Sequence, residues 1–148
     1  MIELAKEAFT NNMYNGNMEA LPKGAYKARI KSAGLRHGKD SKVFCVVNFV
    51  VEDHEHFDGC FASKFYCLYD KERNQDHIQK QVNFLKKDFS VLGLPDNQIN
   101  SKSSDCLDEC CESLVGRLVR VNSVKNKEYT NYYFQGLVND GVADTEGF

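Results

Sequence analysis

Leu21-Pro-Lys-Gly-Ala-Tyr-Lys-Ala-Arg-Ile-Lys-Ser-Ala33 is the stretch of sequence that decides the fold. Its first four residues include a proline and a glycine, which indicates a turn. Apolar and basic side chains then alternate, with Tyr26, Ala28 and Ile30 on one face and Lys27, Arg29 and Lys31 on the other. A period of two is typical of a half-buried β-strand. We therefore expect a strand over residues 25–33 with a row of cations facing solvent.

Four further strands and two helices are predicted after it. The strands cover Val43–Val51, Phe57–Tyr69, Val115–Val124 and Tyr129–Leu137. The longer helix is indicated by apolar residues spaced four and three apart, and Gly93 and Pro95 end it; the apolar residues are Ile78, Val82, Leu85, Phe89 and Leu92. A short helix follows from Asp105 to Leu114, with Ser104 as its N-cap. Three strands, a helical insertion and two strands are the layout of a mainly β, five-stranded OB-fold, a Greek-key barrel; an open α+β sandwich remains an alternative.

The faces of the second and third strands decide which rings are exposed. If Cys45, Val47 and Phe49 point inward, then Phe44, Val46 and Asn48 share the opposite face. On the third strand we expect Lys64 and Tyr66 to point outward, and Phe61, Phe65, Cys67 and Tyr69 to point inward. An error of one residue would exchange the two faces of a strand.

Charge is unevenly distributed along the chain. The formal net charge is −2, which argues against a uniformly basic nucleic-acid coat protein. The last basic residue is Lys127, and the only charged side chains among the 20 residues after Glu128 are acidic. This distribution indicates an acidic tail on a mildly basic body. We divide the chain into an N-terminal arm (1–20), one OB-fold domain (21–139) and an acidic C-terminal tail (140–148). Asp144, Glu146 and Phe148 are the tail residues expected to bind a partner.

Cations and aromatic rings coincide on one predicted surface. An OB-fold binds ligands across its second and third strands, between the loops that join strands 1–2 and 4–5, and both of these loops are basic in this chain. Cations neutralise phosphates, and flat rings stack unpaired bases. The candidate nucleic-acid-binding residues are Lys27, Arg29, Lys31, Arg36, Lys39, Lys42, Phe44, Lys64, Tyr66, Lys125, Lys127, Tyr129 and Tyr132 or its neighbour Tyr133.

Catalytic and metal-binding signals are weak in this sequence. It has no nucleophile elbow, phosphate loop or zinc-protease motif, so we expect neither an enzyme nor a cofactor. His54 and His56 with Cys60 and Cys67 are the one candidate zinc set, although a polar hairpin turn explains the two histidines equally well. Cys106 and Cys110 are expected to be partly exposed on the short helix, and Cys111 to be a core residue.

Four segments resemble phage-encoded single-stranded DNA-binding proteins. They are Leu21–Ile30, Gly38–Lys42, Phe57–Gly59 and Leu114–Val121. The resemblance implies an OB-fold protein of phage replication and recombination that coats ssDNA and forms oligomers, with a dimer as the simplest. It also implies a tail that recruits replication or recombination proteins.

Two other functions remain open besides the coating of ssDNA. The protein could be a module that binds and inhibits a host enzyme, or a recombination protein that anneals complementary single strands of DNA. The chain shows neither a secretion signal nor a membrane span, and its six cysteines are expected to be reduced, so we expect a cytoplasmic setting, in the host if the protein is phage-encoded.

Overall fold

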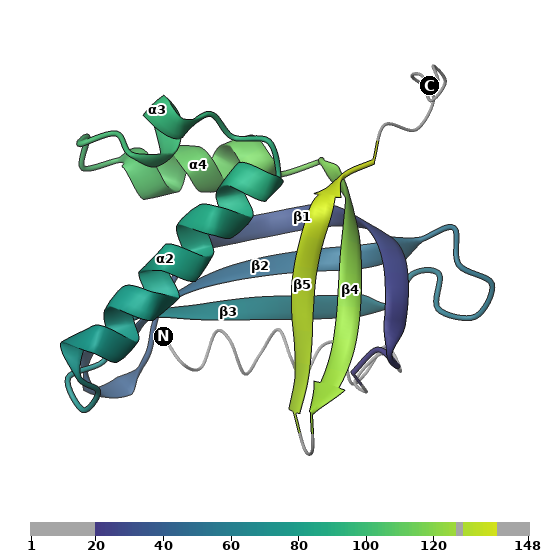
Figure 1. Cartoon of the computed structure of the whole chain (residues 1–148), viewed down its shortest axis with the longest axis horizontal. Helices are drawn as coiled ribbons and strands as arrows, with labels where there is room; N and C mark the ends of the chain where they lie inside the picture. Colours follow the sequence, from purple (N-terminus) through teal and green to yellow (C-terminus); the bar gives the residue numbers. More distant parts are fainter. Residues whose placement is uncertain (1–19, 127–128, 139–148) are drawn as a thin grey trace.

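Five antiparallel strands form one sheet in the computed structural model, which describes residues 20–126 and 129–138 (Figure 1). The strands are β1 (Gly24–His37), β2 (Val43–Glu52), β3 (Phe61–Tyr69), β4 (Leu118–Asn126) and β5 (Tyr129–Leu137). Their order in the sheet is β3-β2-β1-β4-β5. The prediction of a mainly β protein with five strands is therefore confirmed. The predicted arm, apart from residue 20, and the predicted tail lie outside the described residues.

The helical insertion between the third and fourth strands is also confirmed. It contains α2 (Gln75–Val91), α3 (Asp96–Ile99) and α4 (Cys106–Leu114). Asn74 caps α2 by accepting a hydrogen bond from the backbone N–H of His77 at 2.8 Å. Ile78, Leu85 and Phe89 are buried, as the spacing of apolar residues predicts. None of the helices in the described ranges combines the length and the apolar character that a bilayer span needs.

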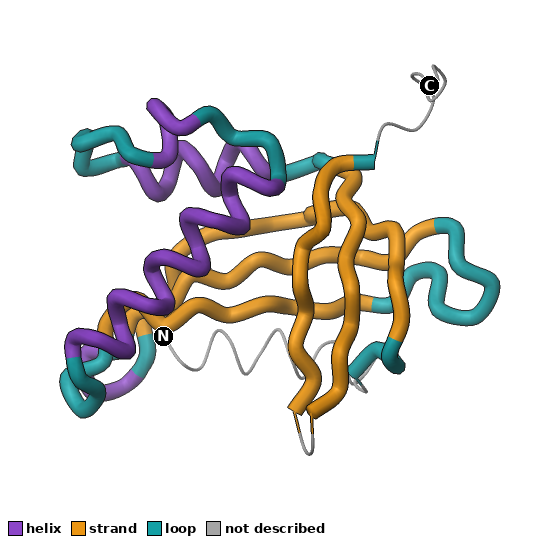
Figure 2. The backbone as a smooth tube through the Cα atoms, in the orientation of Figure 1, coloured by secondary structure: helices purple, strands orange, loops and turns teal. Residues whose placement is uncertain are grey.

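A bend in β1 lets this strand belong to both halves of the sheet. Residues 24–29 pair with β4 and residues 27–37 pair with β2, with a register shift between Ile30 and Ser32. A bulge of this kind increases the local twist of a strand. Figure 2 shows the result: β4 and β5 cross over the other three strands, so the sheet folds onto itself. The Phe49 ring packs edge to face on Tyr132 and Phe134 of β5, at 5.4 and 5.8 Å between ring centroids, and this packing forms the core.

The folded sheet stays open between its two edges, β3 and β5. Within the described residues no backbone ladder joins these strands, so the predicted closure into a barrel is not seen. Helix α2 packs along the opening and contacts both edge strands. The Lys64 ammonium on β3 donates a hydrogen bond to the Tyr132 carbonyl on β5 at 2.5 Å. Side chains and a helix therefore hold the edges in place of strand pairing.

Candidate nucleic-acid interface

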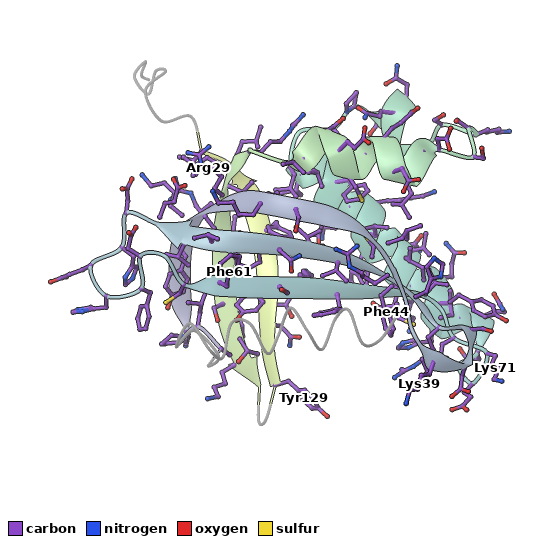
Figure 3. The ribbon with its side chains drawn as sticks, turned by 180° about the vertical axis from the view of Figure 1, so that it is seen from behind. Arg29, Lys39, Phe44, Phe61, Lys71 and Tyr129 are labelled. Atoms are coloured by element: carbon purple, nitrogen blue, oxygen red, sulfur yellow. The ribbon has the colours of Figure 1, made fainter. Side chains whose placement is uncertain are left out.

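The surface of β1, β2 and β3 that faces away from the core is the first candidate interface, and we call it the outer face. The inner face of β2 is fixed by Cys45, Val47, Phe49 and Val51, all of which are buried in the core. The strand register places the alternate residues in rows across the outer face, and the rows are Arg29–Val50–Phe61, Ser32–Asn48–Ser63, Gly34–Val46–Phe65 and Arg36–Phe44–Cys67. Figure 3 looks onto this face and labels Phe44 and Phe61 toward its two ends.

A line of three polar side chains crosses the middle of the outer face. The Asn48 amide donates to the Ser32 hydroxyl at 2.8 Å, and the Ser63 hydroxyl donates to the Asn48 oxygen at 2.5 Å. These bonds fix the orientation of the Asn48 amide. A base lying on this face would therefore meet hydrogen-bonding groups that are already held in place.

Phenylalanine rings flank this polar line on the β2 and β3 side. Phe44 and Phe65 meet edge to face with ring centroids 6.4 Å apart, and Phe65 is 43% exposed. Phe61 is partly exposed at the opposite end of β3. The predicted outward orientation of Phe44 is confirmed, whereas the predicted inward orientation of Phe61 and Phe65 is wrong. The outer face therefore carries more exposed aromatic surface than the sequence suggested.

Tyr66 and Tyr132 were predicted to stack bases, and the structure places both in the core. Tyr66 is 2% exposed, and its hydroxyl donates to the Asp88 carboxylate at 2.6 Å. Tyr132 is 8% exposed, and its hydroxyl accepts from the backbone N–H of Leu21 at 3.2 Å. Burial raises the pKa of both tyrosines, and the neighbouring Asp88 raises that of Tyr66 further. Neither ring is free to stack a base, and for Tyr66 the predicted outward phase was off by one residue.

Lys64 also lies on the opposite side of β3 from the predicted one. Its ammonium sits 3.1 Å from the Asp88 carboxylate, and its side chain is only 19% exposed. It also lies over the ring of Tyr133, 5.2 Å from the centroid. Tyr133, the alternative to Tyr132 at the sequence level, is the exposed ring of the two, and Tyr129 is 73% exposed at the start of β5.

Besides Lys64, three more of the predicted cations make ion pairs with carboxylates. Arg29 forms a two-pronged contact with Glu52 at 2.8 and 3.1 Å. Lys27 lies 2.8 Å from Asp53 and holds the pKa of that carboxyl below its usual range. Lys42 is 4.0 Å from Asp70. A phosphate would have to compete with these carboxylates, so the three residues add little positive field.

The remaining described cations of the predicted set are accessible to solvent. Lys31, Lys39 and Lys125 are exposed, and Arg36 is partly exposed. Lys39 belongs to a short 3-10 turn (Lys39–Ser41) that joins β1 to β2. Figure 3 shows Lys39 and Tyr129 on the same side of the molecule, beyond β3. The predicted Lys127, Asp144, Glu146 and Phe148 lie outside the described residues.

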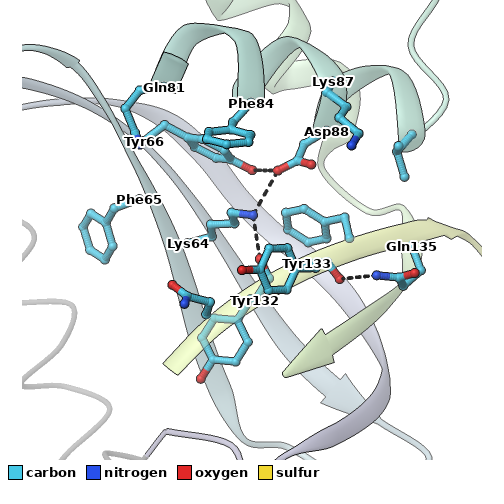
Figure 4. Close-up of a pocket in the computed structure, with 13 residues that line it drawn as sticks. Lys64, Phe65, Tyr66, Gln81, Phe84, Lys87, Asp88, Tyr132, Tyr133 and Gln135 are labelled. Carbon is cyan, nitrogen blue, oxygen red and sulfur yellow. Dashed lines mark hydrogen bonds and ion pairs between the residues drawn. The ribbon is translucent and has the colours of Figure 1, made fainter. Parts of the chain in front are cut away.

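A cleft of about 510 Å³ opens between α2 and the two sheet edges, and we call it the edge cleft (Figure 4). Phe65, Phe84 and Tyr133 line it, and these are three of the most exposed apolar side chains in the described chain. Lys87 also lines it, and among the described residues no carboxylate lies within ion-pair distance of that ammonium. The sequence analysis missed Phe84. The sequence pattern that could have revealed it is an aromatic residue outside the apolar stripe of α2, placed four residues after Lys80 and three before Lys87, on the same polar side of the helix.

The histidine cluster builds a turn. His54 Nδ1 accepts hydrogen bonds from the backbone N–H groups of His56 and Phe57 at 3.0 and 3.1 Å. Across residues 20–126 and 129–138, no three His, Cys, Asp or Glu side chains come together as a metal-binding group. The candidate zinc set is therefore not assembled.

The helical cysteines lie deeper than predicted. Cys111 is buried as expected, but Cys110 is buried as well, at 1% exposure. Burial, together with the neighbouring Cys106, raises the pKa of the Cys110 thiol to about 11, so this group stays protonated near neutral pH.

No protein-family model matches the chain, and comparison with curated proteins also finds no match.

Proposed function

We propose that this protein is a non-catalytic single-stranded DNA-binding protein and that its sheet is an OB-fold. The strand order and the position of the helices support this fold, since β1 pairs with both β2 and β4 and the insertion lies between β3 and β4. In this reading the seam between β3 and β5 is bridged by Lys64, Tyr132 and α2 in place of a backbone ladder. The four segments that resemble phage ssDNA-binding proteins support the same assignment.

The observation that carries the proposal is the composition of the outer face. Phe44, which is partly exposed, and Phe65, which is exposed, pack as a pair beside the polar line through Asn48. Arg36 stands in the same row as Phe44, and Lys39 lies in the turn that joins β1 to β2 at that end of the face. Unpaired bases would stack on the rings while the phosphates met these cations. Such binding needs no sequence readout, which suits a protein that coats DNA.

Three further aspects of the proposed function rest on the sequence. The acidic tail would recruit replication or recombination proteins through Asp144, Glu146 and Phe148. The protein would act as a dimer or a larger oligomer, so that neighbouring copies cover a continuous strand. It would work in the cytoplasm, in that of a host cell if the protein is phage-encoded.

A labelled oligo-dT of roughly 30 nucleotides, longer than the 4–16 nucleotides one OB-fold covers, tests the proposal by fluorescence anisotropy. Phe65→Ala removes one stacking ring and should weaken binding by about 5- to 150-fold, the range for one base-ring contact. Val115→Ala is the control, because Val115 is also exposed (48%) but lies beyond the outer face, between α4 and β4. If the four solvent-accessible cations meet phosphates, the logarithm of affinity should fall with the logarithm of salt at a slope of about −3. Absence of binding at low salt would refute the proposal.

Two alternatives give different results in the same set of assays. An annealing protein would also speed the pairing of complementary strands, which a strand-annealing assay detects. A module that inhibits a host enzyme would show no affinity for oligo-dT and would instead form a stable complex with its target.

A further inference from the structure

The edge cleft has the composition of a nucleotide subsite. The side chain of Phe84, on α2, is 55% exposed, and that of Tyr133, on β5, is 47% exposed. Two such rings facing one cleft leave unusually large apolar surface in contact with water. Figure 4 shows Phe84 on the α2 side of the Lys64 ammonium and Tyr133 on the β5 side. Flat surfaces are therefore available on both walls.

Tyr133 is prepared for stacking on one face only. The Lys64 ammonium covers one side of the ring at 5.2 Å from the centroid. Lys64 is itself held by Asp88 at 3.1 Å and by the Tyr132 carbonyl at 2.5 Å, so it is anchored in that position. A ring with a cation on one face and water on the other can accept a base on the open face.

The charge of the cleft suits a ligand that joins a flat ring to a negative charge, as a nucleotide does, better than an apolar ligand alone. Lys64 and Asp88 neutralise each other within the cleft, which leaves the Lys87 ammonium as an additional positive charge at its wall. Gln81, Asn131 and Gln135 contribute amide groups to the same walls. Amides can hydrogen-bond base edges, and a lone ammonium can meet a phosphate.

Phe65 connects the cleft to the outer face. Its ring packs against Phe44 on the outer face, and Figure 4 shows that ring across β3 from the Lys64 ammonium, while the residue itself borders the edge cleft. The connection exists because β3 is an edge strand in the described residues, so that no strand covers the flank of Phe65. A ligand on the outer face can therefore continue past Phe65 and over the free edge of β3 toward the cleft.

We propose that the edge cleft binds a nucleobase and its phosphate, so that ssDNA runs from the outer face over β3 to stack on Phe84 and Tyr133. This inference rests on the proposed function and extends it to a second subsite formed by α2 and β5. The Lys87 ammonium contacts the phosphate of the same nucleotide. Lys64 and Asp88 position the Tyr133 ring and do not contact the DNA.

Three double variants separate stacking from other roles of the two rings. Phe84→Ala with Tyr133→Ala removes both rings, Phe84→Leu with Tyr133→Leu keeps apolar bulk without a ring, and Phe84→Tyr with Tyr133→Phe keeps both rings. Because both side chains are exposed, all three proteins should melt within a few degrees of the wild type. Melting curves of the full chain check this before binding is compared.

Affinity is measured for oligo-dT strands of increasing length. Short strands that fill the outer face alone should bind all variants equally. On longer strands the alanine and leucine variants should lose about 5- to 150-fold in affinity, while the ring-retaining variant keeps wild-type affinity. Photocrosslinking with 5-iodo-deoxyuridine should label the peptides that contain Phe84 or Tyr133 in wild-type protein.

Each outcome has a distinct meaning. If the wild type binds no oligo-dT at any length, the proposed function itself is wrong. If it binds but all three double variants match it at every length and the two peptides stay unlabelled, the cleft does not bind DNA and only this inference is overturned. Loss of affinity in the alanine variant with full recovery in the leucine variant would show an apolar contact without base stacking, and would also overturn it.

Discussion

Replacing Tyr66 by phenylalanine removes one hydroxyl from the core and should destabilise the protein measurably. That hydroxyl donates to the Asp88 carboxylate at 2.6 Å, and the tyrosine side chain is 2% exposed. A hydrogen bond to a charged group contributes about 1.5–3 kcal/mol. Asp88 keeps Lys64 as a partner at 3.1 Å, so the carboxylate is not left unpaired in the variant. We therefore expect a loss of about 2 kcal/mol, which lowers the melting temperature by roughly 4–8 °C in a domain of this size.

Urea unfolding followed by circular dichroism measures this loss. Tyr69→Phe is the matched control, because the same hydroxyl is removed from the same strand at a position that is 45% exposed. It should change the free energy of unfolding by less than about 0.5 kcal/mol. If the two variants are equally stable, the hydroxyl of Tyr66 makes no bond to Asp88 and the inward phase of β3 is wrong. Phenylalanine stacks as well as tyrosine, so a base-stacking role for Tyr66 would also predict no loss.

Two further predictions concern a tight glycine and the alkaline limit of stability. A Cβ at Gly93 would lie 2.8 Å from Arg117 Nη1, which donates a hydrogen bond to the Leu92 carbonyl at 2.9 Å, and the φ angle of Gly93 is +99°. Gly93→Ala should therefore cost about 2–4 kcal/mol of unfolding free energy. Gly59→Ala should cost only about 1–2 kcal/mol, because φ is also positive at Gly59 but nothing lies within 4 Å of the added Cβ. Equal losses would show that Arg117 moves freely. Burial and Asp88 raise the pKa of Tyr66, so the stability it confers is complete below about pH 10 and falls as the pH rises above that value. Tyrosinate absorbance should show it ionising only with unfolding, and ionisation in the still-folded protein would contradict this.

Most of the fold could be predicted from local patterns of apolar and polar residues in the sequence. β5 has the predicted bounds, β2 differs by one residue at its end, and α2 buries Ile78, Leu85 and Phe89 of the predicted apolar stripe. On β5 and α2 the burial follows the period of the element, and β2 has the inward phase predicted for Cys45, Val47 and Phe49. β1 is longer than predicted because Gly34, Leu35 and Arg36 continue its pairing with β2. β4 starts later than predicted, at Leu118. Gly116 has a φ of +91°, which is not a strand conformation, so a turn separates α4 from β4.

The error on β3 has a physical cause outside the strand. Residues 61–69 read Phe-Ala-Ser-Lys-Phe-Tyr-Cys-Leu-Tyr, and the phase with more apolar side chains is the one that the structure turns outward. The inward phase contains Lys64 and Tyr66, whose polar ends both reach Asp88 on α2. Local alternation cannot reveal this acceptor, because it lies 22 residues beyond Tyr66 in the sequence. Long-range satisfaction of two polar groups outweighs the apolar preference of the strand.

That outcome leaves an energetic question at the outer face. By facing Phe61 and Phe65 outward, β3 gives up burial worth about 1.5–3 kcal/mol for each ring that could have been fully covered. Sequences that break a local rule tend to do so where a function requires it. Phe61 stands in a row with Val50 and Phe65 in a row with Val46, on either side of the polar line through Asn48, which is an ordered surface rather than a scatter of apolar side chains. A ligand with flat apolar faces and a charged backbone would recover the lost burial on binding, and this is the physical reason to look for DNA on this side of the sheet.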